Sequence, residues 1–294
     1  MFRSSTVWIT IVLGFICGMG QPDTAGGAEI AFHHDVGGVV VNHIISHDES
    51  LVELARRYDV GYNEIAAANP TLDPFIPEVG DNAVIPGRWI LPDVPRRRGI
   101  VINLAEMRLY YFNSRSREKV ETHPVGIGDE GWETPVGTYS IVEKIVNPAW
   151  YVPASIRKQK PELPAVVPSG PDNPLGTHAL RLSIGTVLIH GTDRPFGIGR
   201  RVSHGCIHLY PEDIAHMFHE VTVGTIVTIV RQQVKATCAQ GRVLVEVHGT
   251  GGKDLEQEAI DLLVRKKLFS KVDMGRLRSA VQAGTGIPTD VTAN

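Results

Sequence analysis

The chain has 294 residues, of which 43% are hydrophobic and 21% are charged, so it can bury at least one sizeable core and is not a disordered protein. Its 29 basic and 32 acidic residues are mixed along the sequence and give a net charge of -3, which argues against nucleic acid as a partner. The 30 glycines and 19 prolines favour a turn-rich, mainly β architecture, and the length favours roughly two domains.

The N-terminal segment is typical of an export signal. Arg3 precedes the apolar run 7–16, and small residues follow up to Ala28. The run is shorter than the roughly 20 residues of a membrane span. We therefore expect a signal peptide over residues 1–28 that is removed on export, and no permanent membrane anchor. A retained anchor is the alternative.

A small unit precedes a proline-rich, basic linker over residues 92–98. Hydrophobic periodicity and turn residues predict a strand, two helices and a second strand within it. Asp48 or Ser50 can cap the first of these helices. The predicted elements begin at residues 39, 51, 62 and 81.

Sequence punctuation within residues 39–91 resembles that of the LysM module. Three short matches occur in the expected order, namely His47-Asp48-Glu49-Ser50-Leu51, Ala68-Asn69-Pro70 and Val84-Ile85-Pro86. The resemblance implies binding to the N-acetylglucosamine-containing glycan strands of peptidoglycan. The usual Gly-Asp-Thr before the first helix is replaced here, and a spacer that only positions its neighbour is the alternative.

Beyond the linker, runs of β-branched and aromatic residues predict a sandwich or barrel over residues 99–231. The proline-rich insertion 147–178 is expected to line or cover a site. A C-terminal extension over residues 232–294 is predicted to combine a strand with a helix. The predicted strands of the main domain are 99–104, 108–112, 137–142, 179–182, 186–190 and 225–230.

One cysteine lies near three histidines in the segment 189–209. A thiol becomes a strong nucleophile when it loses its proton, and a neighbouring imidazole can take that proton. Cys206 is therefore a candidate catalytic residue with a histidine as its base. The backbone N–H groups of Gly205 and Cys206 could receive a developing oxyanion.

Two other interpretations of these residues remain open. If the segment is extended, His204, Cys206 and His208 share one face and could bind zinc, with His190 as a fourth ligand. This would make the protein a zinc-dependent peptidoglycan hydrolase. Alternatively, export would allow Cys206 to pair with Cys238 in a disulfide.

The same segment resembles the signature of the L,D-transpeptidase (YkuD-type) catalytic domain, through His190-Gly191-Thr192 and Ser203-His204-Gly205-Cys206. Supporting matches lie at 134–139 and 169–176, and the resemblance covers about residues 99–231. It implies that Cys206 is the nucleophile and His190 the proton donor and acceptor, without a metal or cofactor. The implied supporting residues are Gly191, Ser203, His204 and Gly205.

Together with the LysM-like pattern, this domain is similar to the periplasmic branch of Gram-negative envelopes. The resemblance implies that Cys206 attacks a stem tetrapeptide of peptidoglycan and releases D-Ala, leaving a thioester. An amine of a second stem would then give a 3-3 cross-link, a lysine of an outer-membrane lipoprotein would give protein attachment, and water would give carboxypeptidase activity. A non-catalytic wall-binding protein would need only the LysM-like unit.

One position departs from the family pattern. Two residues after the cysteine the family usually carries Arg or Asn, and this chain carries His208. Imidazole titrates near pH 6.5, so a fixed positive charge is lost. We expect altered recognition of the donor, with Arg200 or Arg201 supplying the missing charge.

Overall fold

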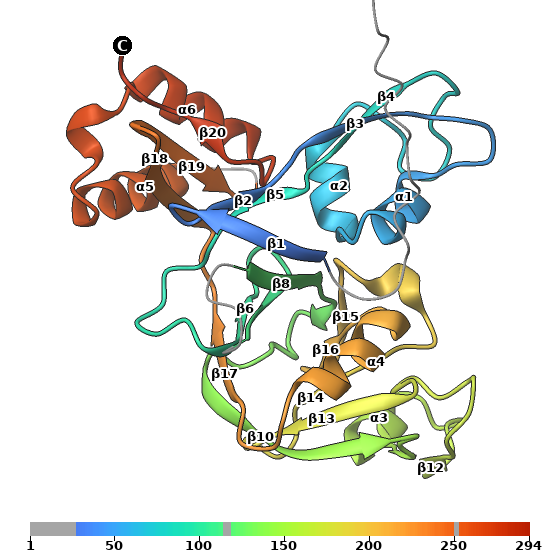
Figure 1. Ribbon diagram of the computed structural model, residues 1–294. Helices are drawn as coiled ribbons and strands as arrows, with labels where there is room; N and C mark the ends of the chain where they lie inside the picture. Colours follow the sequence, from blue (N-terminus) through green and yellow to red (C-terminus); the bar gives the residue numbers. More distant parts are fainter. Residues whose placement is uncertain (1–27, 114–118, 250–252) are drawn as a thin grey trace, which may run out of the picture.

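The computed structural model describes residues 28–113, 119–249 and 253–294. They form an N-terminal unit, a central sheet domain and a C-terminal unit, which are seen in blue, green to orange, and red in Figure 1. The predicted signal segment lies outside the described residues, apart from Ala28, at which the first strand begins. No helix in the described part of the chain is long and apolar enough to cross a membrane.

The N-terminal unit has the predicted order of a strand, two helices and a strand. Of the two candidate caps for its first helix, Ser50 is confirmed. Its hydroxyl accepts the Glu53 N–H at 3.2 Å, and the Glu53 carboxylate accepts the Ser50 N–H at 3.1 Å. The elements are β3 (Val41–Ile44), α1 (Leu51–Arg57), α2 (Tyr62–Ala68) and β4 (Asn82–Ile85), with β3 and β4 antiparallel.

The main sheet confirms the mainly β prediction. Its 11 strands follow the order β16-β14-β13-β10-β17-β6-β7-β8-β1-β2-β5. The predicted strands are β6 (Gly99–Asn103), β7 (Arg108–Phe112), β10 (Gly137–Val146), β13 (His178–Leu182), β14 (Leu188–His190) and β17 (Ile226–Val230). Five further strands of this sheet were not predicted, namely β1 (Ala28–His33), β2 (Val36–Gly38), β5 (Arg88–Ile90), β8 (Lys119–Pro124) and β16 (Ile207–His208).

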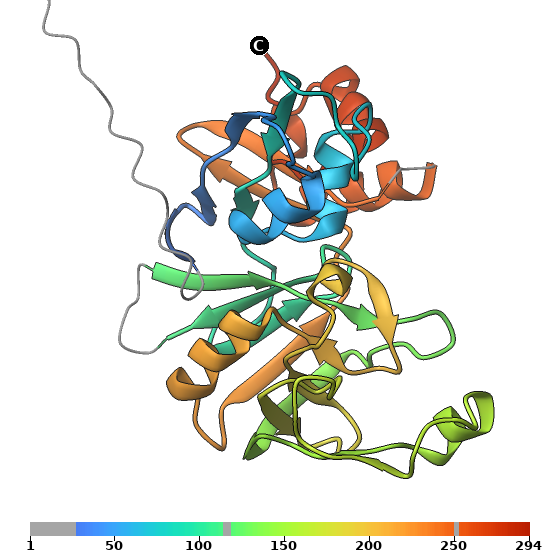
Figure 2. The same cartoon turned by 90° about the vertical axis from the view of Figure 1, so that its right-hand side faces the viewer.

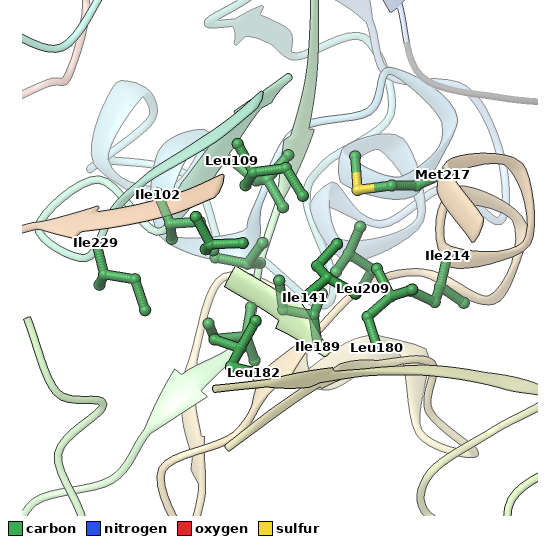
Figure 3. Close-up of a cluster of buried hydrophobic side chains, with 14 of the residues drawn as sticks. Ile102, Leu109, Ile141, Leu180, Leu182, Ile189, Leu209, Ile214, Met217 and Ile229 are labelled. Atoms are coloured by element: carbon green, nitrogen blue, oxygen red, sulfur yellow. The ribbon is translucent and has the colours of Figure 1, made fainter. Parts of the chain in front are cut away.

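Segments on both sides of the linker 92–98 thus contribute strands to one sheet. The strand β7 is buried on both faces because a different core covers each face. Its Leu109 belongs to the central core, where the helix α4 (Pro211–Glu220) adds Ile214 and Met217 (Figure 3). Its Tyr110 belongs to the core that Leu51 and the rest of the N-terminal unit form on the other face.

The proline-rich insertion carries short elements that were not predicted. They are β11 (Trp150–Tyr151), α3 (Ala154–Gln159) and β12 (Val166–Val167). This arm lies at the end of the molecule that is opposite the C-terminal unit (Figures 1 and 2). At its base the buried Asn173 amide donates to the carbonyl oxygens of Pro148 and Pro168, both at 2.9 Å.

The C-terminal unit has a core of its own, in which two helices pack on a small sheet. It is joined to the main sheet by the buried Lys235, whose ammonium donates to the Ile90 carbonyl at 2.6 Å and pairs with Glu246 at 2.7 Å. Its elements are β18 (Val234–Ala239), β19 (Arg242–Val247), α5 (Lys253–Arg265), the 3-10 turn Phe269–Lys271, α6 (Met274–Ala283) and β20 (Thr289–Asp290).

Candidate active site

Parallel pairing of β14 with β16 brings the predicted site residues to one edge of the main sheet. His190 ends β14 and lies in register with His208 of β16, and their ring centroids are 4.4 Å apart. Cys206 immediately precedes β16, and its Sγ lies 3.9 Å from the carbonyl oxygen of Thr186, which precedes β14. The chain is therefore folded so that the cysteine and two of the three histidines come from neighbouring strands.

A tight loop fixes the backbone before the cysteine. The Ser203 hydroxyl donates to the Cys206 carbonyl at 2.6 Å and accepts the Gly205 N–H at 3.1 Å. Gly205 has a φ of 100°, a conformation that side-chain-bearing residues rarely adopt. The Gly205 N–H already donates to Ser203, so of the two backbone donors predicted for an oxyanion the Cys206 N–H is the remaining candidate.

A second pair of strands places an aromatic residue beside this loop. The strand β15 (Arg201–Ser203) pairs with β9 (Ile127–Gly128), and the Asp129 N–H donates to the Ser203 carbonyl at 2.8 Å. The following turn sets the Trp132 ring edge-on against His204, with centroids 4.8 Å apart. Trp132 was not among the predicted site residues.

His190 is held as a neutral imidazole. Its Nδ1–H donates to the Gly191 carbonyl at 2.6 Å, an assignment that leaves Nε2 as the proton acceptor. Burial lowers the pKa of His190 well below its ordinary value, His208 adds to this effect, and the carbonyls of Gly191 and Leu175 oppose it. At neutral pH the imidazole therefore carries no charge and is free to take a proton.

The insertion reaches this histidine through a close backbone contact. Gly176 has a φ of 66°, and a Cβ there would lie 3.0 Å from the Cα of Gly191. A glycine is thus needed for the end of the insertion to pack against the end of β14. The expectation that the insertion lines the site is consistent with the contribution of the Leu175 carbonyl to the His190 environment.

Cys206 is a protonated thiol at rest. Burial raises its pKa above the ordinary value, while the Leu188 backbone and the charge of Arg181 act in the opposite direction. A thiol beside a neutral imidazole differs from a preformed thiolate and imidazolium pair. A nucleophilic attack by this sulfur would therefore need a base to take its proton.

This protonation state predicts the reactivity of the thiol. Alkylation of Cys206 by iodoacetamide should be slow at pH 7 and should accelerate about tenfold per pH unit up to pH 9, because the rate follows the thiolate fraction. Peptide mapping by mass spectrometry separates Cys206 from Cys238, and the Cys206→Ala chain supplies the background. A rate that is already constant below pH 7 would show that an ion pair is present instead.

The remaining predicted residues have other partners. The Arg200 guanidinium lies over the Tyr62 ring of α2 at 3.7 Å, and Arg201 lies 4.0 Å from a Glu133 carboxylate oxygen. Burial lowers the pKa of His208 to about 4, so this imidazole is neutral at pH 7. His208 therefore brings no positive charge to the site, and Arg200 is engaged by the N-terminal unit.

The two alternative interpretations of the cysteine are not supported. Cys206 and Cys238 are both free, and Cys238 lies in β18 of the C-terminal unit. Within residues 28–113, 119–249 and 253–294, two groups of side chains have the spacing to hold a metal, and neither contains Cys206, His204 or His208. Among these residues, the unpaired sulfurs and the spacing of the candidate ligands favour a free Cys206 thiol.

Comparison with known proteins agrees with a thiol-dependent site. Residues 97–229 match the family model of the L,D-transpeptidase catalytic domain. The chain is 40% identical to "Probable L,D-transpeptidase YcfS" of Escherichia coli K12 over 266 residues, which cover 85% of this chain and 82% of the relative. It is 39% identical to "Probable L,D-transpeptidase YbiS" of the same strain over 255 residues, which cover 82% of each chain.

Among solved structures, the catalytic domain of the E. faecium L,D-transpeptidase aligns with a TM-score of 0.36 and 21% identity, covering 46% of this chain and 99% of that chain. The identities and coverage of the two relatives establish the family. The chain belongs to the L,D-transpeptidases, a family of cysteine-dependent acyltransferases that act on peptidoglycan peptides.

Proposed function

We propose that this protein is a periplasmic peptidoglycan L,D-transpeptidase in which Cys206 is the nucleophile and His190 the proton donor and acceptor. The observation that carries the proposal is the parallel register of β14 and β16, which sets His190 beside the strand that follows Cys206. Membership of the family supports the reaction type. The predicted signal segment supports export.

The first half of the reaction forms a thioester. The Cys206 sulfur bonds to the carbonyl carbon of the third stem residue while its proton passes to Nε2 of His190. The carbonyl oxygen becomes an oxyanion and accepts the Cys206 N–H. The intermediate then collapses, and the leaving D-Ala nitrogen takes the proton from His190.

The second half transfers the acyl group to an amine. His190 takes a proton from the acceptor amine as the amine attacks the thioester, and the returning proton restores the Cys206 thiol. A diamino acid of a second stem gives a 3-3 cross-link. A lysine of an outer-membrane lipoprotein gives protein attachment, and water gives carboxypeptidase activity.

A charged pocket next to the His204 loop favours the stem diamino acid. It is lined by three carboxylates and two guanidinium groups, from Asp129, Glu130, Glu133, Arg201 and Arg231. The side chain of the diamino acid ends in an amine, which can pair with the carboxylates of the pocket, and a carboxylate, which can pair with its guanidinium groups. A peptide lysine offers only the amine, so it would leave the guanidinium groups of the pocket without a partner. In this proposal Arg201 contacts the acceptor.

We further propose that the N-terminal unit is a LysM module that holds the enzyme on glycan strands. The strand, helix, helix, strand order supports it. The unit is also docked next to the catalytic loop, because the Tyr62 N–H donates to the Ile198 carbonyl at 3.2 Å and Arg200 stacks on Tyr62. Glycan binding and stem recognition would thus occur on one rigid surface.

The test is intact-protein mass spectrometry of the mature chain mixed with a disaccharide tetrapeptide. We expect an adduct of the disaccharide-tripeptide acyl group on Cys206 together with free D-Ala. The Cys206→Ala chain is the control and should give neither. A wild-type chain that binds sacculi yet forms no adduct and releases no D-Ala would be a wall-binding protein without this activity.

The acceptor is identified by adding amines to the same mixture. We expect a second tetrapeptide to consume the adduct faster than a lysine-containing peptide at equal concentration, and Arg201→Gln to reduce this preference. Equal rates for the two amines would contradict the assignment of the charged pocket to the diamino acid. An adduct that decays only by hydrolysis would indicate a carboxypeptidase.

A further inference from the structure

A second group of titratable side chains lies where the N-terminal unit meets the central domain, and the proposed reaction does not use it. Asp59 follows α1, His123 lies in β8, and Asp213 lies in the first turn of α4. One ligand atom from each residue lies within 4.8 Å of those of the other two. Candidate ligand atoms from three segments that are distant in sequence therefore lie close together.

His123 is oriented as a metal-binding histidine is. Its side chain is fully buried, and its Nε2 lies 2.7 Å from the carboxylate of Glu121. A carboxylate that accepts one ring N–H of a histidine fixes the other nitrogen toward the ion in metal sites. Here the other nitrogen, Nδ1, faces Asp213.

The spacing between these two groups fits a shared ion better than a direct hydrogen bond. His123 Nδ1 and Asp213 Oδ1 are 3.4 Å apart, which is longer than the range of about 2.7–3.2 Å for an N–H···O bond. Ligands at about 2.0–2.1 Å from a tetrahedral Zn²⁺ lie about 3.3–3.4 Å from each other. Among the described residues, neither His123 Nδ1 nor the buried Asp213 Oδ2 has a hydrogen-bond partner.

Carboxylates outnumber cations at the cluster, because the nearest guanidinium groups, Arg108 beside Asp59 and Arg56 beside Asp213, are paired with Glu64 and Glu212. The carboxylates of Asp213 and Glu121 are buried, and Asp59 is only partly exposed. A dication would neutralise more of this negative charge than a single proton on His123 does.

We propose that Asp59, His123 and Asp213 form a divalent-metal site, for which Zn²⁺ is the fitting ion, and that this site fastens the N-terminal unit to the central domain. Imidazole and carboxylate ligands suit Zn²⁺, and the three ligands come from both sides of the contact. The site reinforces neighbouring contacts across the same boundary, where Arg56 donates to Glu212 at 2.8 and 2.9 Å. Its role is structural, since none of the three ligands is a residue of the proposed reaction.

The test is metal binding by the mature chain after removal of metals with a chelator. The Cys206→Ala chain is used so that the catalytic thiol cannot take up zinc. We expect one equivalent of Zn²⁺ by calorimetry and a rise in Tm of about 5 °C at a hundredfold excess over Kd. Co²⁺ should give visible absorption bands, which report the ligand set without any further substitution.

Substitutions then locate the ion. His123→Gln and Asp213→Asn should abolish the stoichiometric uptake, and Glu121→Gln should weaken it about tenfold because it loosens the orientation of His123. His219→Gln, an exposed histidine on the same helix α4, is the matched control and should bind normally. If the Cys206→Ala chain takes up no Zn²⁺ or Co²⁺, or if uptake survives both ligand substitutions, the cluster is an ion triad around a protonated His123 and the proposal is wrong.

Discussion

Replacement of His190 by Gln is expected to lower kcat for acyl transfer by about 10²- to 10⁴-fold while the fold is retained. A glutamine amide can still donate to the Gly191 carbonyl, as the imidazole does at 2.6 Å, but it cannot take the thiol proton. Because burial keeps Cys206 protonated at neutral pH, the loss of the base should slow the attack of the sulfur on the donor. The measurement is D-Ala release at saturating donor.

The matched control is His178→Gln, which changes a partly exposed histidine in the neighbouring strand β13 and should leave kcat within about twofold. The residual activity of the His190→Gln chain should rise with pH, because Cys206 then ionises without a base. A His190→Gln chain that keeps more than a tenth of the activity would assign the proton transfer to another group.

The candidate catalytic segment could be proposed from sequence because its residues lie close together in the chain. A cysteine next to a glycine and close to two histidines, with a third histidine at the end of an apolar strand, can be recognised without coordinates. The environment of that histidine could not be predicted from sequence, because it depends on contacts between distant segments. Leu175 lies in the insertion, and its carbonyl contributes to the environment of His190. Trp132 contacts His204 because β9 pairs with β15.

The same division applies to the fold. Strands and helices with a clear period, such as β7 and α2, appear at the predicted residues. The helix α4 was missed although Pro211 at its first turn and Ile214, Met217 and Phe218 at helical spacing were available as signals. Strands β1, β2 and β5 carry weak local patterns, and their pairing with the main sheet is set by tertiary contacts.

Buried charges were the least predictable feature, because charged residues are normally assigned to the surface. Arg108 is fully buried, and its Nε and Nη2 donate to the two carboxylate oxygens of Glu64 at 2.9 and 2.8 Å. The guanidinium also lies 4.1 Å from the Trp89 ring centre, and the Trp89 indole donates to Glu64 at 2.8 Å. One ion pair therefore joins α2 to β7 across the contact between the N-terminal unit and the central domain.

Glu64→Gln is expected to destabilise the protein by about 3–5 kcal/mol, because the buried Arg108 guanidinium would lose the carboxylate charge that accepts two of its hydrogen bonds. The measurement is the free energy of unfolding in urea. Glu143→Gln is the matched control, since its partner Arg181 is exposed and such pairs contribute about 1 kcal/mol or less. Equal losses in the two variants would mean that solvent reaches Arg108, and that the contact between the two parts depends on packing rather than on this ion pair.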